Sequence, residues 1–230
     1  MDKYLNERLC AAITQKQIDK EHIEQLINEG ADPLGPLFDE KDTAIGELFL
    51  VAGTEGISDN IPVIVEMFIE KGLDCARFSK TDGDSHMELW SLVHSSSEGA
   101  CEALKIMIEN NLRVSALEDF ICHFYEDCEY CDGSEMDDEY EEYITWSLKT
   151  IMMCASYPKL LKESKYLRLC IEMNDTNKEN DYDLTKFKNY NEYEYYFDLS
   201  TIDTAPYGLR NAGVEIRRKE TGEVVWRLHI

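Results

Sequence analysis

Apolar residues recur along the first half of the chain in a pattern that predicts pairs of amphipathic helices. In the segment 61–69 they include the three- and four-residue spacing of a helix face that packs in a core. The segment 103–108 has the same pattern. A shorter apolar run precedes each long helix, at 9–13, 48–52 and 89–93, and polar residues separate the two. We therefore expect helix–turn–helix units that bury their paired faces against one another.

The end of the longer helix occurs three times, in the segments Leu26–Asp32, Phe68–Asp74 and Met107–Arg113. The residue that follows the helix is Gly30, Gly72 or Asn111, which places the copies 42 and 39 residues apart. Glycine, and asparagine after it, tolerates the left-handed backbone that closes many helices. Self-similarity at such a period is typical of a repeat array, whose long surface favours binding over catalysis.

The sequence Glu29-Gly30-Ala31-Asp32-Pro33 resembles the end of an ankyrin repeat, and 48–52 lies where the inner helix of such a repeat would be. The resemblance covers residues 1–157. Two features depart from the family: the Thr-Pro-Leu-His start is missing, and the period exceeds the usual value of roughly 33 residues. The resemblance therefore implies a degenerate stack of helical hairpins with lengthened turns, without regular β-fingers.

The chain changes character after residue 174. Strand-forming aromatic residues fill 192–199, and the segments 214–219 and 223–230 flank Glu220-Thr221-Gly222, which is a good hairpin signal. This pattern predicts a small antiparallel sheet at the C-terminus. We expect the sheet to cap the open end of the helical stack.

The predicted fold class is α+β and mainly α, with stacked helical hairpins (degenerate ankyrin-like repeats) followed by a small C-terminal antiparallel sheet. The repeat array is expected over 1–157, where a fourth, distorted unit holds an acidic insertion at 118–142. The segment 158–230 is expected to add a helix, a loop and the β-hairpin as an appendage packed on the array. The residues predicted to be buried between successive helix pairs are Leu48, Leu50, Phe68, Leu89, Trp90, Leu104 and Ile108.

Composition limits the compartment and the partners. No run reaches the roughly 18 apolar residues of a membrane helix, and the first residues lack the apolar part of a signal peptide. We therefore predict a cytoplasmic protein without a membrane partner, in which the 8 cysteines are reduced thiols. The net charge of −24 disfavours nucleic acid and anionic membranes, and it favours a basic protein partner or simply solubility.

The negative charge is concentrated in 118–142, which holds 12 acidic residues and no lysine or arginine, so it carries half of the net charge. Carboxylates there would attract a basic surface, and neighbouring tyrosines would supply apolar anchors. The candidate partner-binding residues are Asp137, Asp138, Glu139, Glu141, Glu142, Tyr130, Tyr140 and Tyr143. The alternative is a solvated loop without a role, in which case the tyrosine-rich stretch 190–197 becomes the candidate interface.

The best candidate metal cluster is Cys122, His123, Cys128 and Cys131, because Cys128 and Cys131 have the spacing of a zinc-binding pair. A second such pair is missing, and Cys122 fits equally well as a core residue beside Ile121. We therefore predict free thiols, no bound zinc and no cofactor.

Catalytic motifs are missing from the sequence. It contains no glycine-rich phosphate loop, no serine-hydrolase motif and no zinc-protease motif, and its 5 histidines are scattered. The sequence thus predicts a non-enzymatic, protein-binding protein. The sharper hypothesis is a bacterial immunity-type inhibitor that neutralises a basic toxin, such as a nuclease, by direct binding. An ankyrin-like adaptor and a phage-type inhibitor of a host protein fit the same residues, and an enzyme with an unrecognised Cys/His site is the outsider.

Overall fold

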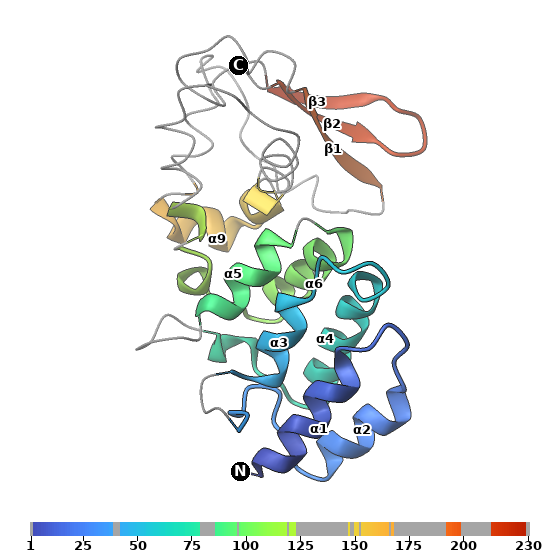
Figure 1. Ribbon diagram of the computed structural model, residues 1–230. Helices are drawn as coiled ribbons and strands as arrows, with labels where there is room; N and C mark the ends of the chain where they lie inside the picture. The colour runs from blue at the N-terminus through green and yellow to red at the C-terminus, as the bar shows by residue number, and fades with distance from the viewer. Residues whose placement is uncertain are drawn as a thin grey trace, which may run out of the picture. The chain divides into compact units, whose positions relative to one another are not determined.

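The computed structural model confirms a mainly helical chain with a small antiparallel sheet near its C-terminus (Figure 1). The residues that it describes are 2–38, 42–78, 86–95, 97–118, 120–122, 147, 150–151, 153–165, 167, 192–198 and 213–228. They belong to two compact units, Met1–Leu117 and Glu118–Ile230. The boundary that we expected at residue 157 lies inside the second unit, and the division of the chain into an array and an appendage stays a prediction.

The first unit contains six α-helices among its described residues. They are α1 (Lys3–Ile13), α2 (Lys20–Asn28), α3 (Ala44–Leu50), α4 (Ile61–Glu70), α5 (His86–His94) and α6 (Glu98–Glu109), with short 3-10 turns η1 (Ser58–Asn60), η2 (Cys75–Arg77) and η3 (Val114–Ala116). Helix α1 packs on α2 and α3, α3 packs on α5, and α6 packs on α4 and α5. Figure 1 shows α1, α3 and α5 in one row, with α2, α4 and α6 beside them.

Local sequence signals account for where these helices begin. The side chains of Asp19, Thr43 and Ser97 each accept a hydrogen bond from a backbone N–H in the first turn of α2, α3 and α6. Such a cap satisfies a donor that the helix itself leaves without a partner. Helix α4 has Pro62 in its first turn, where a missing N–H costs little.

The predicted left-handed helix ends are confirmed in all three copies. The φ angles are 106° at Gly30, 103° at Gly72 and 70° at Asn111. In each copy the next N–H donates to the carbonyl five residues earlier: Ala31 to Leu26 (3.0 Å), Leu73 to Phe68 (2.8 Å) and Leu112 to Met107 (2.9 Å). A further turn then closes with the bonds Gly35 to Asp32, Arg77 to Asp74 and Ala116 to Arg113. The copies therefore share a backbone motif as well as a sequence pattern.

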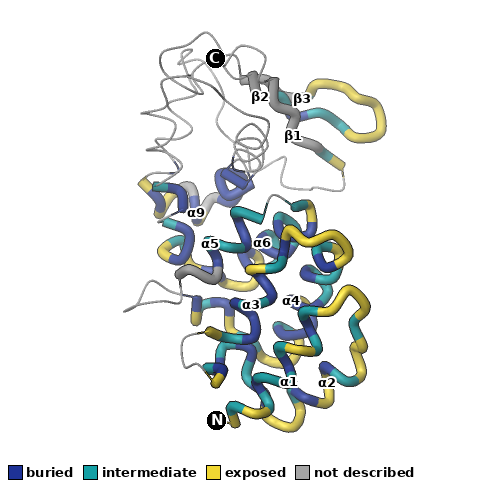
Figure 2. Tube along the Cα trace, in the orientation of Figure 1, coloured by how far each residue is buried: buried dark blue, intermediate teal, exposed yellow. Residues whose placement is uncertain are grey.

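Most of the predicted core of this unit is buried. Leu48, Phe68, Leu89, Leu104 and Ile108 are buried as expected, and Figure 2 shows buried positions along the helices and exposed ones in many of the connections.

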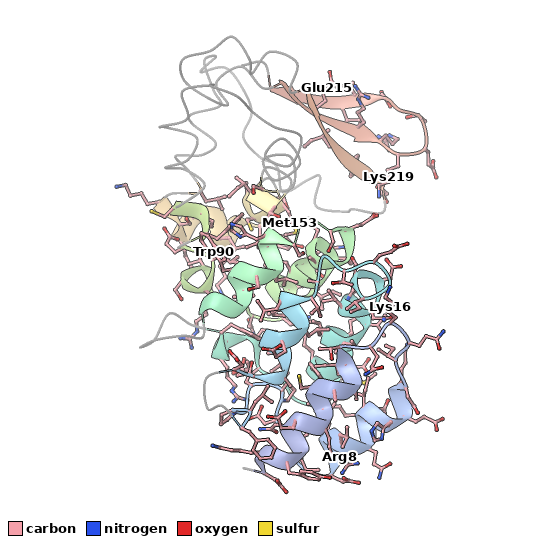
Figure 3. All side chains as sticks on the ribbon, viewed as in Figure 1. Arg8, Lys16, Trp90, Met153, Glu215 and Lys219 are labelled. Carbon is pink, nitrogen blue, oxygen red and sulfur yellow. The ribbon has the colours of Figure 1, made fainter. Side chains whose placement is uncertain are left out.

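Two core predictions are wrong. Leu50 is 61% exposed, because it is the last residue of α3 and the buried face of that helix is formed by Ala44, Ile45, Leu48 and Phe49. Trp90 is only half-buried, and its ring stacks on His94 with 4.2 Å between the ring centroids (Figure 3). His94 is the last residue of α5.

The second unit is described as a helix, a sheet and a set of buried residues. Helix α9 spans Pro158–Glu163. The strands β1 (Tyr193–Asp198), β2 (Gly213–Arg218) and β3 (Val224–Leu228) pair antiparallel in the order β1-β2-β3. The predicted hairpin around Gly222 is confirmed, since Gly222 has a φ of 66° between β2 and β3. The aromatic stretch predicted at 192–199 forms β1, which pairs with β2.

No helix among the described residues is long and apolar enough to cross a membrane.

Candidate protein-binding surfaces

The predicted partner-binding residues all lie outside the described residues. They are Tyr130, Asp137, Asp138, Glu139, Tyr140, Glu141, Glu142 and Tyr143, and they stay a prediction. The same holds for His123, Cys128 and Cys131. Cys122 is half-buried and forms no disulfide, and the described part of the chain holds no group of histidine, cysteine and acidic residues able to bind a metal ion.

Four described residues at the start of the acidic segment and after its end are packed. Phe120 and Ile121 lie near its start, Ser147 and Ile151 follow it, and all four are buried. Phe120 and Ile121 are therefore part of the core of the second unit.

A second acidic surface lies in the first unit, where the sequence analysis did not place one. It begins on α1 with Glu7 and Cys10, which are three residues apart and so share a face of the helix. On α3, which packs on α1, Glu47 and Leu50 have the same spacing. The connection between the second and third helices, which contains Phe38 and Asp42, completes the surface, as the hydrogen bonds below show.

This connection is fixed to α1 by two neighbouring side chains. The fully buried Asn6 donates from Nδ2 to the Pro36 carbonyl (3.1 Å), and its Oδ1 accepts from the Asp32 N–H (2.9 Å). Glu7 Oε1 accepts from the Phe38 N–H at 2.8 Å. A single antiparallel bridge between Pro36 and Thr43 brings the chain back to α3. The backbone of Phe38 is therefore held by packed residues, although its side chain is 61% exposed.

Three carboxylates lie near enough to Cys10 to affect its thiol. Burial and the negative charges of Glu47, Glu7 and Asp42, in that order, raise the pKa of the Cys10 thiol to about 11. Burial and the charge of Asp74 raise the pKa of Cys75 to about 11 as well. Both thiols are therefore protonated at neutral pH, a state that suits neither a nucleophile nor a metal ligand.

We call the set Glu7, Cys10, Phe38, Asp42, Glu47 and Leu50 the Glu7–Glu47 face. Its two large apolar side chains, Phe38 and Leu50, are each 61% exposed. Tyr4, at 62% exposure, differs from them because the Arg8 guanidinium lies 5.9 Å from its ring centroid. The signal for this face is absent from the sequence, because its residues come from three segments that only the fold brings together.

Two arginines of the hairpin form ion pairs within it. Arg217 Nη2 lies 2.6 Å from Glu215 Oε2, and Arg218 Nε lies 3.7 Å from Glu223 Oε2. Arg218 also lies 5.7 Å from the ring centroid of Tyr193. Glu215 and Lys219 are labelled in Figure 3. Charges neutralised in this way give little attraction for the phosphates of a nucleic acid.

Comparison of the chain with models of known protein families, with characterised proteins and with solved structures finds no match.

Proposed function

We propose that the first unit is a degenerate ankyrin-like stack, and that the chain works in the cytoplasm by binding another protein rather than by catalysis. The observation that carries the proposal is the helix end at Gly30, Gly72 and Asn111, which recurs with the same backbone hydrogen bonds. A structural unit repeated in this way gives an extended surface rather than a single enclosed site.

Hydrogen bonds from one unit to the preceding one support the stack. Asn60, which precedes α4, donates from Nδ2 to the carbonyls of Gln15 (3.3 Å) and Lys16 (3.1 Å) in the first helix–helix turn. Ser97, which precedes α6, donates from Oγ to the Ala52 carbonyl (3.2 Å) in the next such turn. The residue before each long helix therefore has the same role in two successive units.

An ion pair joins two equivalent turns. Arg77, at the end of η2, makes a two-pronged contact with Asp32, with Nη1 to Oδ1 at 3.2 Å and Nη2 to Oδ2 at 3.1 Å. The two residues occupy the turns that follow the first and second helix ends. Two parallel hydrogen bonds fix the orientation of the planar guanidinium, so this contact sets the spacing of the turns as well as stabilising it.

The partner that fits the charge is a basic protein. The chain carries −24 overall, and the segment 118–142 alone holds 12 acidic residues without a basic one. Like charges at this density repel unless a partner neutralises them. An immunity-type inhibitor that covers a basic toxin, for example a nuclease, would use these charges to speed the encounter. An ankyrin-like adaptor or a phage-type inhibitor of a host protein is the second candidate.

A comparison of two charge variants tests this proposal. The partner is first isolated with the intact chain as bait, and its association rate is then measured at several salt concentrations. One variant carries Asp137→Asn, Asp138→Asn, Glu139→Gln, Glu141→Gln and Glu142→Gln. The matched control carries Glu21→Gln, Glu55→Gln, Asp59→Asn, Glu66→Gln and Glu70→Gln, all at exposed positions of the first unit.

The first variant should associate about tenfold more slowly at low salt and lose most of its salt dependence, since the steering charges are gone. The control, with the same net charge, should associate at close to the parental rate. Equal rates for the two variants would show that net charge alone matters, and would remove the acidic segment as the binding surface.

A further inference from the structure

The exposed apolar side chains of the Glu7–Glu47 face belong to residues whose backbone is held in place by hydrogen bonds. The peptide N–H of Phe38 donates to Glu7, and the fully buried Asn6 holds the preceding residues of the same connection. Leu50 ends α3, whose first turn is capped by the Thr43 hydroxyl at 3.0 Å from the Gly46 nitrogen. A partner would therefore lose little free energy by ordering this surface, because its backbone is already held.

Acidic residues outnumber basic ones among the described residues of the same face. Glu7, Asp42 and Glu47 are close enough to Cys10 to act on its titration. The basic residues of α1 are Lys3, which lies four residues before Glu7 on the same side of the helix, and Arg8.

Arg8 interacts with Glu29 and Tyr4, which are not part of this face. Its Nη1 lies 3.8 Å from Glu29 Oε2, and its guanidinium lies over the ring of Tyr4. Three carboxylates beside two exposed apolar side chains are complementary to a segment that carries both lysine or arginine and an apolar residue.

We propose that the Glu7–Glu47 face is a docking surface for a basic segment of a protein partner, with its cations at Glu7, Asp42 and Glu47 and an apolar side chain against Phe38 or Leu50. All residues of this surface belong to the first unit, and none belongs to the acidic segment 118–142. The inference shares with the proposed function only the basic character of the partner. The two can therefore fail independently.

A peptide titration tests the docking surface without a known partner. The probe is a short synthetic peptide of lysine, arginine and leucine, added to the full-length ¹⁵N-labelled protein. A second peptide has the same charge but serine in place of leucine. The cross-peaks of residues on the face, including Phe38 and Leu50, should move with the first peptide, and the second peptide should bind more weakly.

Two double variants and one single variant decide whether the face is specific. The double variant Glu7→Gln/Glu47→Gln should weaken binding of the leucine peptide about threefold to tenfold, since two charge pairs with the peptide are lost. The control Glu21→Gln/Glu66→Gln has the same net charge and should bind as the parent does. Leu50→Ser should weaken binding while leaving the thermal melt unchanged, because the side chain is exposed.

Three results would overturn the inference. Equal affinities for the two double variants would mean that the peptide responds to net charge alone. Shifts confined to residues 118–142 would place binding on the acidic segment, which would favour the proposed function and reject this face. Concentration-dependent shifts of Phe38 and Leu50 without peptide would mean that a second copy of the chain covers them.

Discussion

Gly99, in the first turn of α6, should tolerate no side chain. The substitution Gly99→Ala therefore tests the packing between the second and third helix pairs. A Cβ atom at this position would lie 2.0 Å from the Ser58 carbonyl oxygen, 2.6 Å from its carbonyl carbon and 2.8 Å from its Oγ. The nearest atoms belong to the backbone of η1, which cannot rotate away as a side chain can. Helix α6 would therefore have to move away from η1, on which it packs.

The sign of the change in stability shows whether helix propensity or overpacking has the larger effect at this position. Alanine favours a helix interior over glycine by up to about 1 kcal/mol, so local propensity alone predicts a gain in stability. Overpacking a close contact costs about 1–3 kcal/mol, and this cost should outweigh the gain. The expected net loss of about 1–2 kcal/mol would lower the melting temperature by about 2–4 °C per kcal/mol for a chain of this size.

Chemical denaturation followed by circular dichroism at the helical wavelength measures this loss. Ser58→Ala is the matched control, since it removes Oγ but leaves the carbonyl group that makes the two shortest contacts. The double variant Ser58→Ala/Gly99→Ala should therefore remain destabilised by nearly the full amount. Gly99→Ala at or above the parental stability, or full rescue by Ser58→Ala, would refute the argument from backbone contact.

Further predictions concern the core, a helix end, a thiol and metal content. Phe68→Ala or Leu104→Ala should cost about 2–5 kcal/mol, and thermal melts that overlay the parent would show that the packing is wrongly assigned. Gly72→Ala should cost about 1 kcal/mol in the same melts, because a φ of 103° is unfavourable for a residue with a Cβ. The Cys10 thiol should react slowly with iodoacetamide at pH 8 and faster as pH rises toward its pKa of about 11, read by mass spectrometry. The raised folded-state pKa of this group contributes stability below pH 9 that is lost as pH rises through about 11, so a pH series of unfolding should decline across that window. Elemental analysis should find no stoichiometric zinc; one zinc per chain that disappears in Cys128→Ser would reverse this prediction.

Features that depend on a few neighbouring residues could be predicted from the sequence, whereas features that depend on the fold could not. The helix ends at Gly30, Gly72 and Asn111 were predictable, because a left-handed residue is specified by its own side chain and the turn before it. The burial of Leu50 was wrongly predicted because the run 48–52 is apolar throughout, so its pattern does not show which residues face the core. Leu50 is exposed because α3 ends at this residue.

The two candidate surfaces also differ in whether the sequence alone could predict them. The acidic segment is visible in the sequence because its charges are consecutive. The Glu7–Glu47 face combines residues from α1, α3 and the connection before α3, and its apolar members look like ordinary core residues until their exposure is known. A surface assembled from separate segments leaves no local pattern, so only the fold could reveal it.

The contacts between successive units have a consequence for how the first unit assembles. The hydrogen bond of Asn60 to Gln15, that of Ser97 to Ala52 and the ion pair of Arg77 with Asp32 each join residues 45 positions apart. Each contact therefore closes a loop of about one repeat, and the entropy lost on closure grows only slowly with loop length. Assembly can begin at any adjacent pair of units and spread to the next, which is expected of quasi-one-dimensional folds. Damage at one end should likewise remain near that end, so loss of α1 and α2 would loosen α3 and α4 before it reached α6.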